Sequence, residues 1–314
     1  MNCLTSSLPK ERRIDLSFKQ TEPYIDFNTR TKKVQCSYFD LLKKPIEIYL
    51  FIDPICPNSW TINPYIRKLQ LEYGRFFTIR PILCSHLLQT NQFFINHPEQ
   101  IDEINHRMML HPQKCFGPKN FNRIELKYPA DIFFAIKAAE LQGINAGRRY
   151  LQKIQEHLLF NQTDISIDDV LIQVAKEAKL DVDEFIRDLH SNSAKKALRC
   201  DLKVSREMEI DQTPSIVFFS ESDEDEGLKI AGSYGYDIYV KVLSTLLQTR
   251  IHPIDKPELE DFMSYYHFTS SEEIAIIYDF SVKKAEREMK KLQLKQIVKK
   301  VYVNGQSYWH YQKQ

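Results

Sequence analysis

The segment FIDPICPNSW, at positions 51–60, contains a cysteine followed after two intervening residues by a serine, where a thiol–disulfide enzyme would carry a second cysteine. The four positions of this motif are Cys56, Pro57, Asn58 and Ser59. A cysteine at the start of a helix is a candidate nucleophile, because the backbone N–H groups and the helix dipole there stabilise the thiolate. Ser59 cannot form the intramolecular disulfide on which dithiol exchange depends, so the sequence supplies only half of a redox pair.

A second motif, Thr213–Pro214, opens a later apolar segment and completes a constellation typical of thioredoxin folds. A proline at this place has no backbone donor, which lets a partner chain approach the cysteine, and an X–Pro bond can be cis or trans. Two interpretations of Cys56 follow. We favour a partly buried thiol without a reaction of its own, and the alternative is a thiol that forms a mixed disulfide with a partner or with glutathione.

The elements around Cys56 predict the sheet that positions it. The apolar runs at 45–54 and 75–83 predict two strands, and apolar residues at helical spacing between them predict a helix at 58–74. Strand, helix and strand in this order form a βαβ unit. The other elements expected for the sheet are strands at 213–219 and 227–235 and a helix at 236–247.

Helical spacing dominates from about residue 98 to residue 208, between the two halves of the predicted sheet. Ser166 and Asp181 stand where helix N-caps are expected. Plain thioredoxins have no helical block of this size, whereas DsbA-like proteins do. The sequence therefore predicts an α/β protein with a DsbA-like thioredoxin fold and a large helical insertion.

The chain changes character near residue 250, where two prolines mark a boundary. Beyond it, helices are expected at 270–280 and 281–300, followed by a β-hairpin around Asn304–Gly305. This order is typical of a winged helix. We therefore divide the chain into a loosely ordered polar leader (1–40), a DsbA-like domain (41–250) and a small winged-helix-like α+β domain (251–314).

Composition excludes several classes of protein. The 314 residues are 43% hydrophobic and 27% charged with a net charge of +1, which is ordinary for a soluble globular protein. Charges occupy the region where a secretory signal would need apolar residues, and no apolar run is long enough to cross a bilayer. We expect a cytoplasmic protein whose cysteines are mostly reduced, with no metal or other cofactor, because no C-x-x-C pair occurs among Cys3, Cys36, Cys56, Cys84, Cys115 and Cys200.

Several long segments resemble the YjbH/SpxH family, between Lys43 and Tyr311. The segments are KKPIEIYLFIDPICPNSW, LEYGRFFTIRPIL, AIKAAELQG, DLHSNSAKKALRCD, DEGLKIAGSYGYDIY and EIAIIYDFSVKKAEREMKKL. Members of this family are bacterial adapters that deliver the transcription regulator Spx to the ClpXP protease. The resemblance implies a non-catalytic protein whose partners are Spx and ClpX or the ClpXP protease, with neither membrane nor nucleic acid among its partners.

Two departures from the family pattern limit what the resemblance implies. Some members carry C-P-x-C where this chain has Ser59, so redox sensing through such a pair is not carried over. Some members also bind zinc through a histidine-rich N-terminus, whereas the first histidine here is His86. Cys36 without histidines is a poor zinc site, and we carry over no metal.

Two other functions compete with the adapter. One is a thiol–disulfide oxidoreductase or glutathione-using enzyme of DsbA-like fold, which would act through Cys56. The other is a nucleic-acid-binding winged-helix protein, which would bind phosphates through a basic helix. The cations of that helix and its flank are Lys283, Lys284, Arg287, Lys290, Lys291, Lys295, Lys299 and Lys300. Glu286 and Glu288 lie among them, which favours a solvated face over a DNA-binding one.

Three aromatic residues are candidates for contacts with a partner. Trp60 follows the Cys56 motif, and Tyr234 and Tyr236 follow the last expected strand of the sheet. Aromatic side chains supply much of the energy at protein interfaces. We expect Tyr234 and Tyr236 to border the groove near Pro214, whereas packing in the core is the alternative for Trp60.

Overall fold

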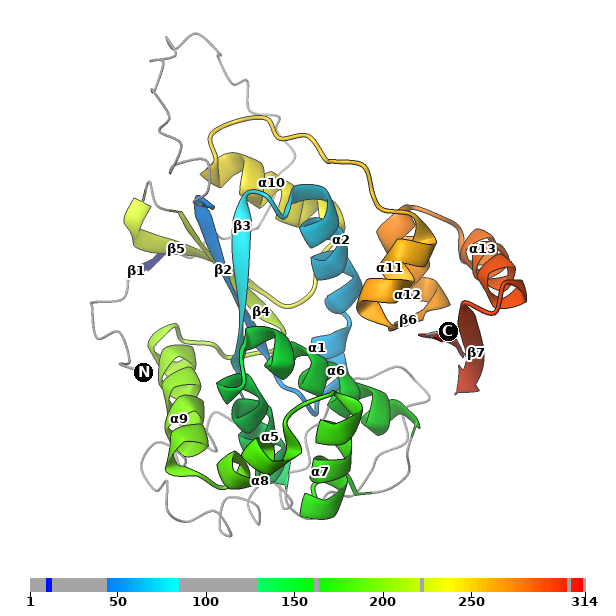
Figure 1. Ribbon diagram of the computed structural model, residues 1–314. Coiled ribbons are helices and arrows are strands. Elements are labelled where there is room, and N and C mark those ends of the chain that lie inside the picture. Colours follow the sequence, from blue (N-terminus) through cyan, green and yellow to red (C-terminus); the bar gives the residue numbers. More distant parts are fainter. Residues whose placement is uncertain are drawn as a thin grey trace, which may run out of the picture.

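A run of β-branched and aromatic residues, IEIYLFI, forms the central strand of the sheet, and five of its seven side chains are buried. The computed structural model describes residues 10–12, 44–84, 129–160, 164–220, 223–303 and 306–312. Its larger sheet has five strands in the order β1-β5-β4-β2-β3 (Figure 1). The strands are β1 (Lys10–Arg12), β2 (Ile46–Ile52), β3 (Phe77–Leu83), β4 (Ser215–Ser220) and β5 (Asp223–Ala231).

Strand pairing has the thioredoxin pattern. Strand β2 pairs in parallel with β3 and antiparallel with β4, and β4 pairs antiparallel with β5. Helix α2 (Asn63–Tyr73) makes the crossover from β2 to β3, and α10 (Tyr236–Leu246) follows β5. The four expected strands and the closing helix are thus confirmed.

Two features of this sheet were not expected from the sequence. Strand β1 lies within the leader that we expected to be loosely ordered, and it pairs in parallel with Glu226–Leu228 of β5. Strand β5 begins at Asp223, four residues earlier than the strand expected at 227–235, so it takes in most of the acidic run. The long ladder with β4 extends the strand into residues whose charges alone would favour a turn.

Five helices of the insertion cover one end of the sheet (Figure 1). They are α5 (Pro129–Leu141), α6 (Ile144–Phe160), α7 (Asp168–Glu177), α8 (Val182–Leu189) and α9 (Asn192–Glu207). Helix α5 is apolar on nearly all sides and is the buried centre of the insertion, as expected for such a helix. The predicted helical insertion is confirmed for these residues, and positions 98–128 lie outside the described ranges.

A buried ion pair fixes α5 to α9 and to the sheet. The ammonium of Lys137 pairs with Asp201, and Asp201 Oδ2 also accepts a hydrogen bond from the backbone N–H of Leu83 at 2.8 Å. Burial acts to lower the pKa of Lys137, but Asp201 and Glu140 raise it above its ordinary value. The lysine therefore stays charged inside the insertion, where losing both carboxylates, Asp201 and Glu140, would leave a buried charge uncompensated.

One of the two expected N-caps of the insertion is confirmed. The side chain of Asp181 accepts from the backbone N–H of Glu184 at 2.9 Å and caps α8. The other prediction is wrong, because Ile167 rather than Ser166 is the N-cap of α7 and provides no side-chain hydrogen bond. The backbone N–H of Ser166 instead donates to the carboxylate of Asp164 at 3.0 Å.

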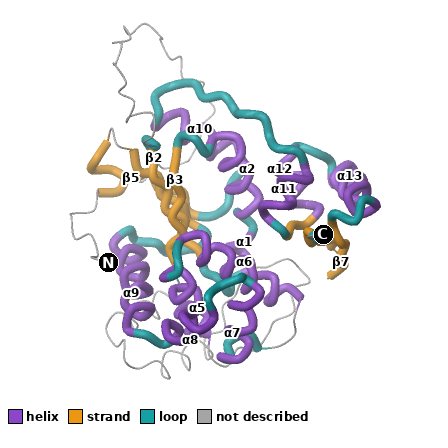
Figure 2. The backbone as a smooth tube through the Cα atoms, viewed as in Figure 1, coloured by secondary structure: helices purple, strands orange, loops and turns teal. Residues whose placement is uncertain are grey.

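A smaller C-terminal unit lies beside α2 (Figure 2). Its strands form a three-stranded sheet in the order β6-β8-β7. Its elements are α11 (Leu259–Tyr266), β6 (Phe268–Ser270), α12 (Ser271–Tyr278), α13 (Val282–Leu294), β7 (Val298–Val303) and β8 (Gln306–Tyr311). A capping box between Ser270 and Glu273 starts α12, and the side chain of Ser281 caps α13.

The two expected helices of this unit and the antiparallel pairing of the expected hairpin are present. Helix α11 and strand β6 are not among the expected elements, because the prolines before them indicate only a boundary. The second expected helix ends at Leu294 instead of position 300, and β7 takes over from Val298. The turn at Asn304–Gly305 lies outside the described residues, and the winged-helix assignment of the unit stays a prediction.

Candidate functional site

The Cys56 turn, which we define as residues 53–60, connects β2 to α1 (Pro57–Trp60). Its backbone is held by local hydrogen bonds. The N–H of Cys56 donates to the carbonyl of Asp53 at 3.2 Å, and the N–H of Ser59 donates to the carbonyl of Cys56 at 2.9 Å. Two further bonds use side chains: the N–H of Asp53 donates to Ser59 Oγ at 3.0 Å, and the N–H of Ile55 donates to Asp53 Oδ1 at 3.1 Å.

The serine that replaces a second cysteine is thus a structural part of this turn. Its hydroxyl accepts a buried hydrogen bond from the backbone at the end of β2, and its side chain is only 1% exposed. Cys56 is fully buried, at 0% exposed, and it is not part of a disulfide. We expected a partly buried thiol, and the structure buries it completely.

The helix after Cys56 is shorter than the sequence predicts. The predicted helix at 58–74 is divided into α1 and α2 by a non-helical turn at 61–62. Pro64 explains the break, because a proline has no N–H to donate and is tolerated only in the first turn of a helix, where the structure places it. A helix of four residues sums fewer peptide dipoles than the longer helix that the sequence predicts.

Thr213 and Pro214 lie at the same end of the sheet as the Cys56 turn. In the β2–β4 ladder Phe51 is opposite Ser215, so the residues that follow β2 and those that precede β4 are neighbours. The Thr213–Pro214 bond is cis, and the Pro214 carbonyl accepts from the N–H of Gly232 at 2.8 Å. The buried hydroxyl of Thr213 has no hydrogen-bond partner among the described residues.

The three aromatic candidates have different surroundings. Trp60 is half-buried, and its indole N–H donates to the Pro54 carbonyl at 3.3 Å. Tyr234 is 41% exposed, so its ring is open to solvent. Tyr236 faces α2: its hydroxyl donates to Glu72 at 2.5 Å, and the ammonium of Lys68 lies 4.4 Å from its ring centre. Burial and the neighbouring Glu72 carboxylate raise the pKa of Tyr236.

A set of charged side chains, of which Lys68 and Glu72 are buried, joins α2 to the C-terminal unit, and the sequence did not reveal it. Lys256 bridges two carboxylates, Glu72 Oε1 at 2.8 Å and Asp279 Oδ2 at 2.6 Å, and Asp279 also pairs with Lys68. Lys68 and Glu72 are each only 6% exposed although both are ionisable. The two cations hold the pKa of Asp279 below its ordinary value despite partial burial. We call Lys68, Glu72, Lys256 and Asp279 the charged seam.

Further contacts extend the junction on both sides of the charged seam. Arg67 donates to the carbonyl of Phe268 and to Glu273, at 3.3 Å each. At the end of α6, the ring of Phe160 packs against the rings of Phe268 and Tyr308, with ring centres 5.4 Å apart in each pair. Helix α2, which follows the Cys56 turn and α1, is therefore also a surface on which the C-terminal unit docks.

Within the described ranges no group of three or more His, Cys, Asp or Glu side chains could hold a metal ion. The described helices include no candidate for a membrane-spanning segment. Burial raises the pKa of the Cys84 thiol well above its ordinary value. Cys200 is disulfide-bonded, which the expectation of mostly reduced cysteines did not include.

Sheet pairing, the position of Cys56 after β2 and the cis proline before β4 define a protein of the thioredoxin class, and a thioredoxin family model matches residues 49–241. The ClpXP adapter protein SpxH of Bacillus subtilis is 42% identical over 85% of this chain and 89% of its own length. The SpxH of Halalkalibacterium halodurans is 39% identical over 86% of this chain and 90% of its own. The chain belongs to the SpxH family, as the resemblance found in the sequence predicts.

Among solved structures, this chain is similar to a probable DsbA oxidoreductase from Streptomyces coelicolor. The similarity has a TM-score of 0.48 and 12% sequence identity, and it covers 68% of this chain and 94% of that one. The assignment of the fold depends on the strand topology and the family model.

Proposed function

We propose that this chain is a non-catalytic, cytoplasmic adapter that binds the transcription regulator Spx and promotes its degradation by ClpXP. Relatives that match most of the chain carry the name ClpXP adapter protein SpxH. We further propose the division into a leader (1–40), a DsbA-like domain (41–250) and a winged-helix-like domain (251–314). The order of helices and strands after residue 258 and their separate hydrophobic core support the last of these.

The observation that favours an adapter over an enzyme is the closed Cys56 turn. A thiol catalyst must bring its sulfur to the substrate, but Cys56 is fully buried and the neighbouring Ser59 hydroxyl already accepts a backbone hydrogen bond. Ser59 also offers no second thiol to release a mixed disulfide. What remains of the redox fold is a rigid support for a binding surface.

An adapter acts by differential binding, without making or breaking a covalent bond. Holding a client next to a protease turns a bimolecular encounter into a local one, and the effective concentration of the client rises accordingly. Alternatively the adapter binds a client conformation that the protease engages more readily, and so shifts the client population toward it. Either route accelerates degradation without consuming the adapter.

Reconstituted degradation tests the proposal. The rate of Spx loss is measured with ClpX, ClpP and ATP, in the presence and absence of the purified protein. We expect clear acceleration by the wild type and by a Cys56→Ser variant, since the thiol has no chemical role. Failure of the wild type to accelerate Spx loss contradicts the adapter function.

A second assay addresses the competing enzyme. Insulin reduction is followed with excess dithiothreitol, which would regenerate a catalytic thiol. We expect no turnover above the rate without protein. Multiple turnovers that disappear in Cys56→Ser would establish the thiol–disulfide oxidoreductase instead.

A further inference from the structure

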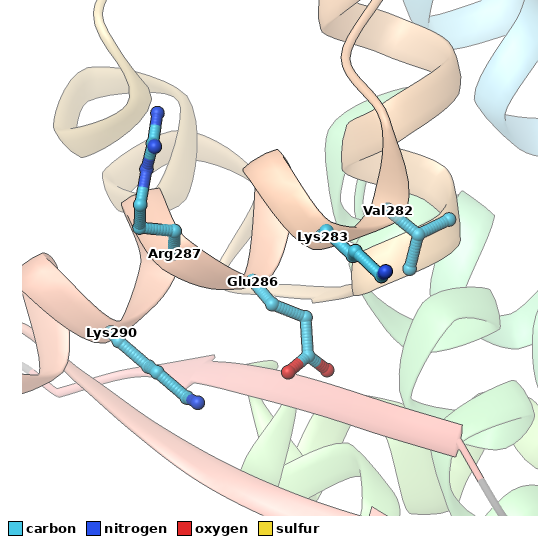
Figure 3. Close-up of a pocket in the computed structure, with 5 residues that line it drawn as sticks. All are labelled: Val282, Lys283, Glu286, Arg287 and Lys290. Atoms are coloured by element: carbon cyan, nitrogen blue, oxygen red, sulfur yellow. The ribbon is translucent and has the colours of Figure 1, made fainter.

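The outer face of α13 carries a pocket of about 340 Å³ (Figure 3). We call this surface the α13 face, and it is lined by Val282, Lys283, Glu286, Arg287 and Lys290. These residues recur at three- and four-residue intervals, so they lie on one side of the helix. The opposite side packs into the core of the C-terminal unit through Ala285, Met289 and Leu292.

The carboxylate on the α13 face is compensated from within the unit. Glu286 pairs with Lys300 at 3.3 Å and accepts from the hydroxyl of Ser271 at 3.3 Å. Figure 3 shows its carboxylate directed toward the neighbouring strand and away from Arg287. The Ser307 hydroxyl donates a hydrogen bond to Glu286. This bond, and to a smaller extent the contact with Lys300, holds the pKa of Glu286 below its ordinary value. Its negative charge is therefore already neutralised by groups behind the pocket.

The three cations of the face are directed to solvent. Lys283, Arg287 and Lys290 are all exposed. Arg287 contacts Glu288 at 3.3 Å, but that carboxylate also binds Lys291 at 2.6 Å, so one negative charge is shared between two cations. Val282, which is 45% exposed, adds an apolar patch at the start of the helix. The face thus offers excess positive charge beside a small apolar surface.

We propose that the α13 face binds an acidic peptide segment that carries one apolar side chain. From Lys283 to Lys290 the helix rises about 10 Å, which is the length of about three extended residues, so successive carboxylates of a short segment can reach all three cations. The apolar side chain of the segment would contact Val282 and the methylene stems of the lysines. A phosphate backbone fits less well, because it has no apolar side chain to contact the exposed Val282.

This inference goes beyond the proposed adapter function, because it assigns a binding face and a ligand chemistry without depending on Spx or ClpXP. The two fail separately: a binding assay with synthetic peptides needs neither protein, and the degradation assay needs no acidic peptide.

Fluorescence anisotropy with the full-length protein tests the inference. The probe is a short labelled peptide of Asp and Glu residues around one Leu, and the comparison peptide has Asn and Gln in place of the acids. The test variant combines Lys283→Glu, Arg287→Glu and Lys290→Glu. A matched control combines Lys196→Glu, Arg199→Glu and Lys203→Glu, which make the same change of charge at exposed positions on one side of α9.

We expect the wild type and the α9 control to bind the acidic probe with affinity that falls as salt is added. The test variant should bind about tenfold more weakly or worse, since several exposed charge pairs are lost together. A single Arg287→Gln variant, which makes a smaller change in charge, should lie between them, and thermal unfolding of each variant establishes that it is folded.

Three results with the peptides would overturn the inference. They are no binding of the acidic probe by the wild type, equal loss of affinity in the test and control variants, and equal affinity for the acidic and the neutral peptide. Tighter binding of a short duplex DNA than of the acidic peptide would also overturn it, in favour of a nucleic-acid partner.

Discussion

The Cys56 turn and the α13 face are opposites in how they treat their polar groups. In the turn, the thiol and the serine hydroxyl face inward, and Ser59 is hydrogen-bonded to the backbone at the end of β2. On the α13 face, the one lining carboxylate is neutralised from behind and the cations face solvent. The reactive residue types of the Cys56 turn are thus inaccessible to a partner. The lysines of the α13 face are ordinary residues, but a partner can reach them.

The comparison has a general consequence for the interpretation of reactive motifs in proteins of this fold. A motif such as Cys-x-x-Ser invites attention because its residue types are reactive, but reactivity needs access as well as type. A solvated charged helix contains no reactive residue type, but its exposed charges can form ion pairs with a partner. Burial and hydrogen bonding, rather than residue type, therefore determine which of the two regions is accessible to a partner.

The largest expected effect concerns the reactivity of Cys56. Because the side chain is fully buried, alkylation requires the turn to open, and each 1.4 kcal/mol of opening free energy slows the reaction tenfold. We expect iodoacetamide to modify Cys56 at least about a hundredfold more slowly in the native protein than in urea. Mass spectrometry of the peptide that contains Cys56 measures both rates.

A cysteine introduced by Ser264→Cys, at an exposed position of α11, serves as the reference for an open thiol. It should react at nearly the same rate in native and denatured protein. Equally fast modification of native Cys56 would remove the contrast between a closed turn and an open face.

The next effect is on stability and sharpens the role of Ser59. Ser59→Ala removes the acceptor that the N–H of Asp53 uses in a buried environment, which should lower the free energy of unfolding by about 1–3 kcal/mol. Urea unfolding followed by circular dichroism measures the change. The control is Ser264→Ala, an exposed serine whose loss should cost less than about 0.5 kcal/mol. Similar values for the two variants would mean that Ser59 has no special structural role.

The smallest expected effect is a change in pKa behind the α13 face. The Ser307 hydroxyl and Lys300 hold the pKa of Glu286 below its ordinary value, so Ser307→Ala should raise that pKa toward the ordinary range. Carbon-13 NMR of the labelled Glu286 carboxyl follows the titration. The control variant replaces the exposed Lys299, the chain neighbour of Lys300, by Met, whose side chain is of similar size. If the pKa of Glu286 is the same in the wild type and in Ser307→Ala, the proposed compensation is contradicted.

The sign of the related pH effect follows from the lowered pKa. Glu286 contributes stability above its unfolded pKa, about 4.3, and this contribution is lost as pH falls through the lower folded value. The C-terminal unit should therefore lose stability in acid, and Ser307→Ala should lose less of it over the same range. Thermal unfolding as a function of pH tests this.

Local patterns in the sequence predicted the sheet well. Strands β2 and β3 were found because their apolar runs are dense and bounded by Pro or Gly, and Asp181 was found as a cap because it precedes an acidic first turn. Patterns failed where two signals competed. Pro64 divided the expected helix after Cys56, and the prolines before α11 concealed the helix that follows them.

The site was predictable in its residue types but not in its exposure. The sequence placed Cys56 and Pro214 at one end of the sheet because strand order alone brings them there. It could not show that Ser59 turns inward to the N–H of Asp53, since that depends on the packing of the turn. The charged seam was equally hidden, because Lys68 and Asp279 are far apart in the chain and each is common on helix surfaces.

The charged seam has a mechanical consequence for the adapter function proposed above. Tension applied to the C-terminal unit would pass through Asp279 and Lys256 to α2, where Lys68 and Glu72 lie one helical turn apart. Separating these groups breaks the ion pairs of the two buried side chains, Lys68 and Glu72, so the C-terminal unit would resist being pulled away from α2. The charged seam would therefore keep α2 and the C-terminal unit in contact while a force acts on one of them.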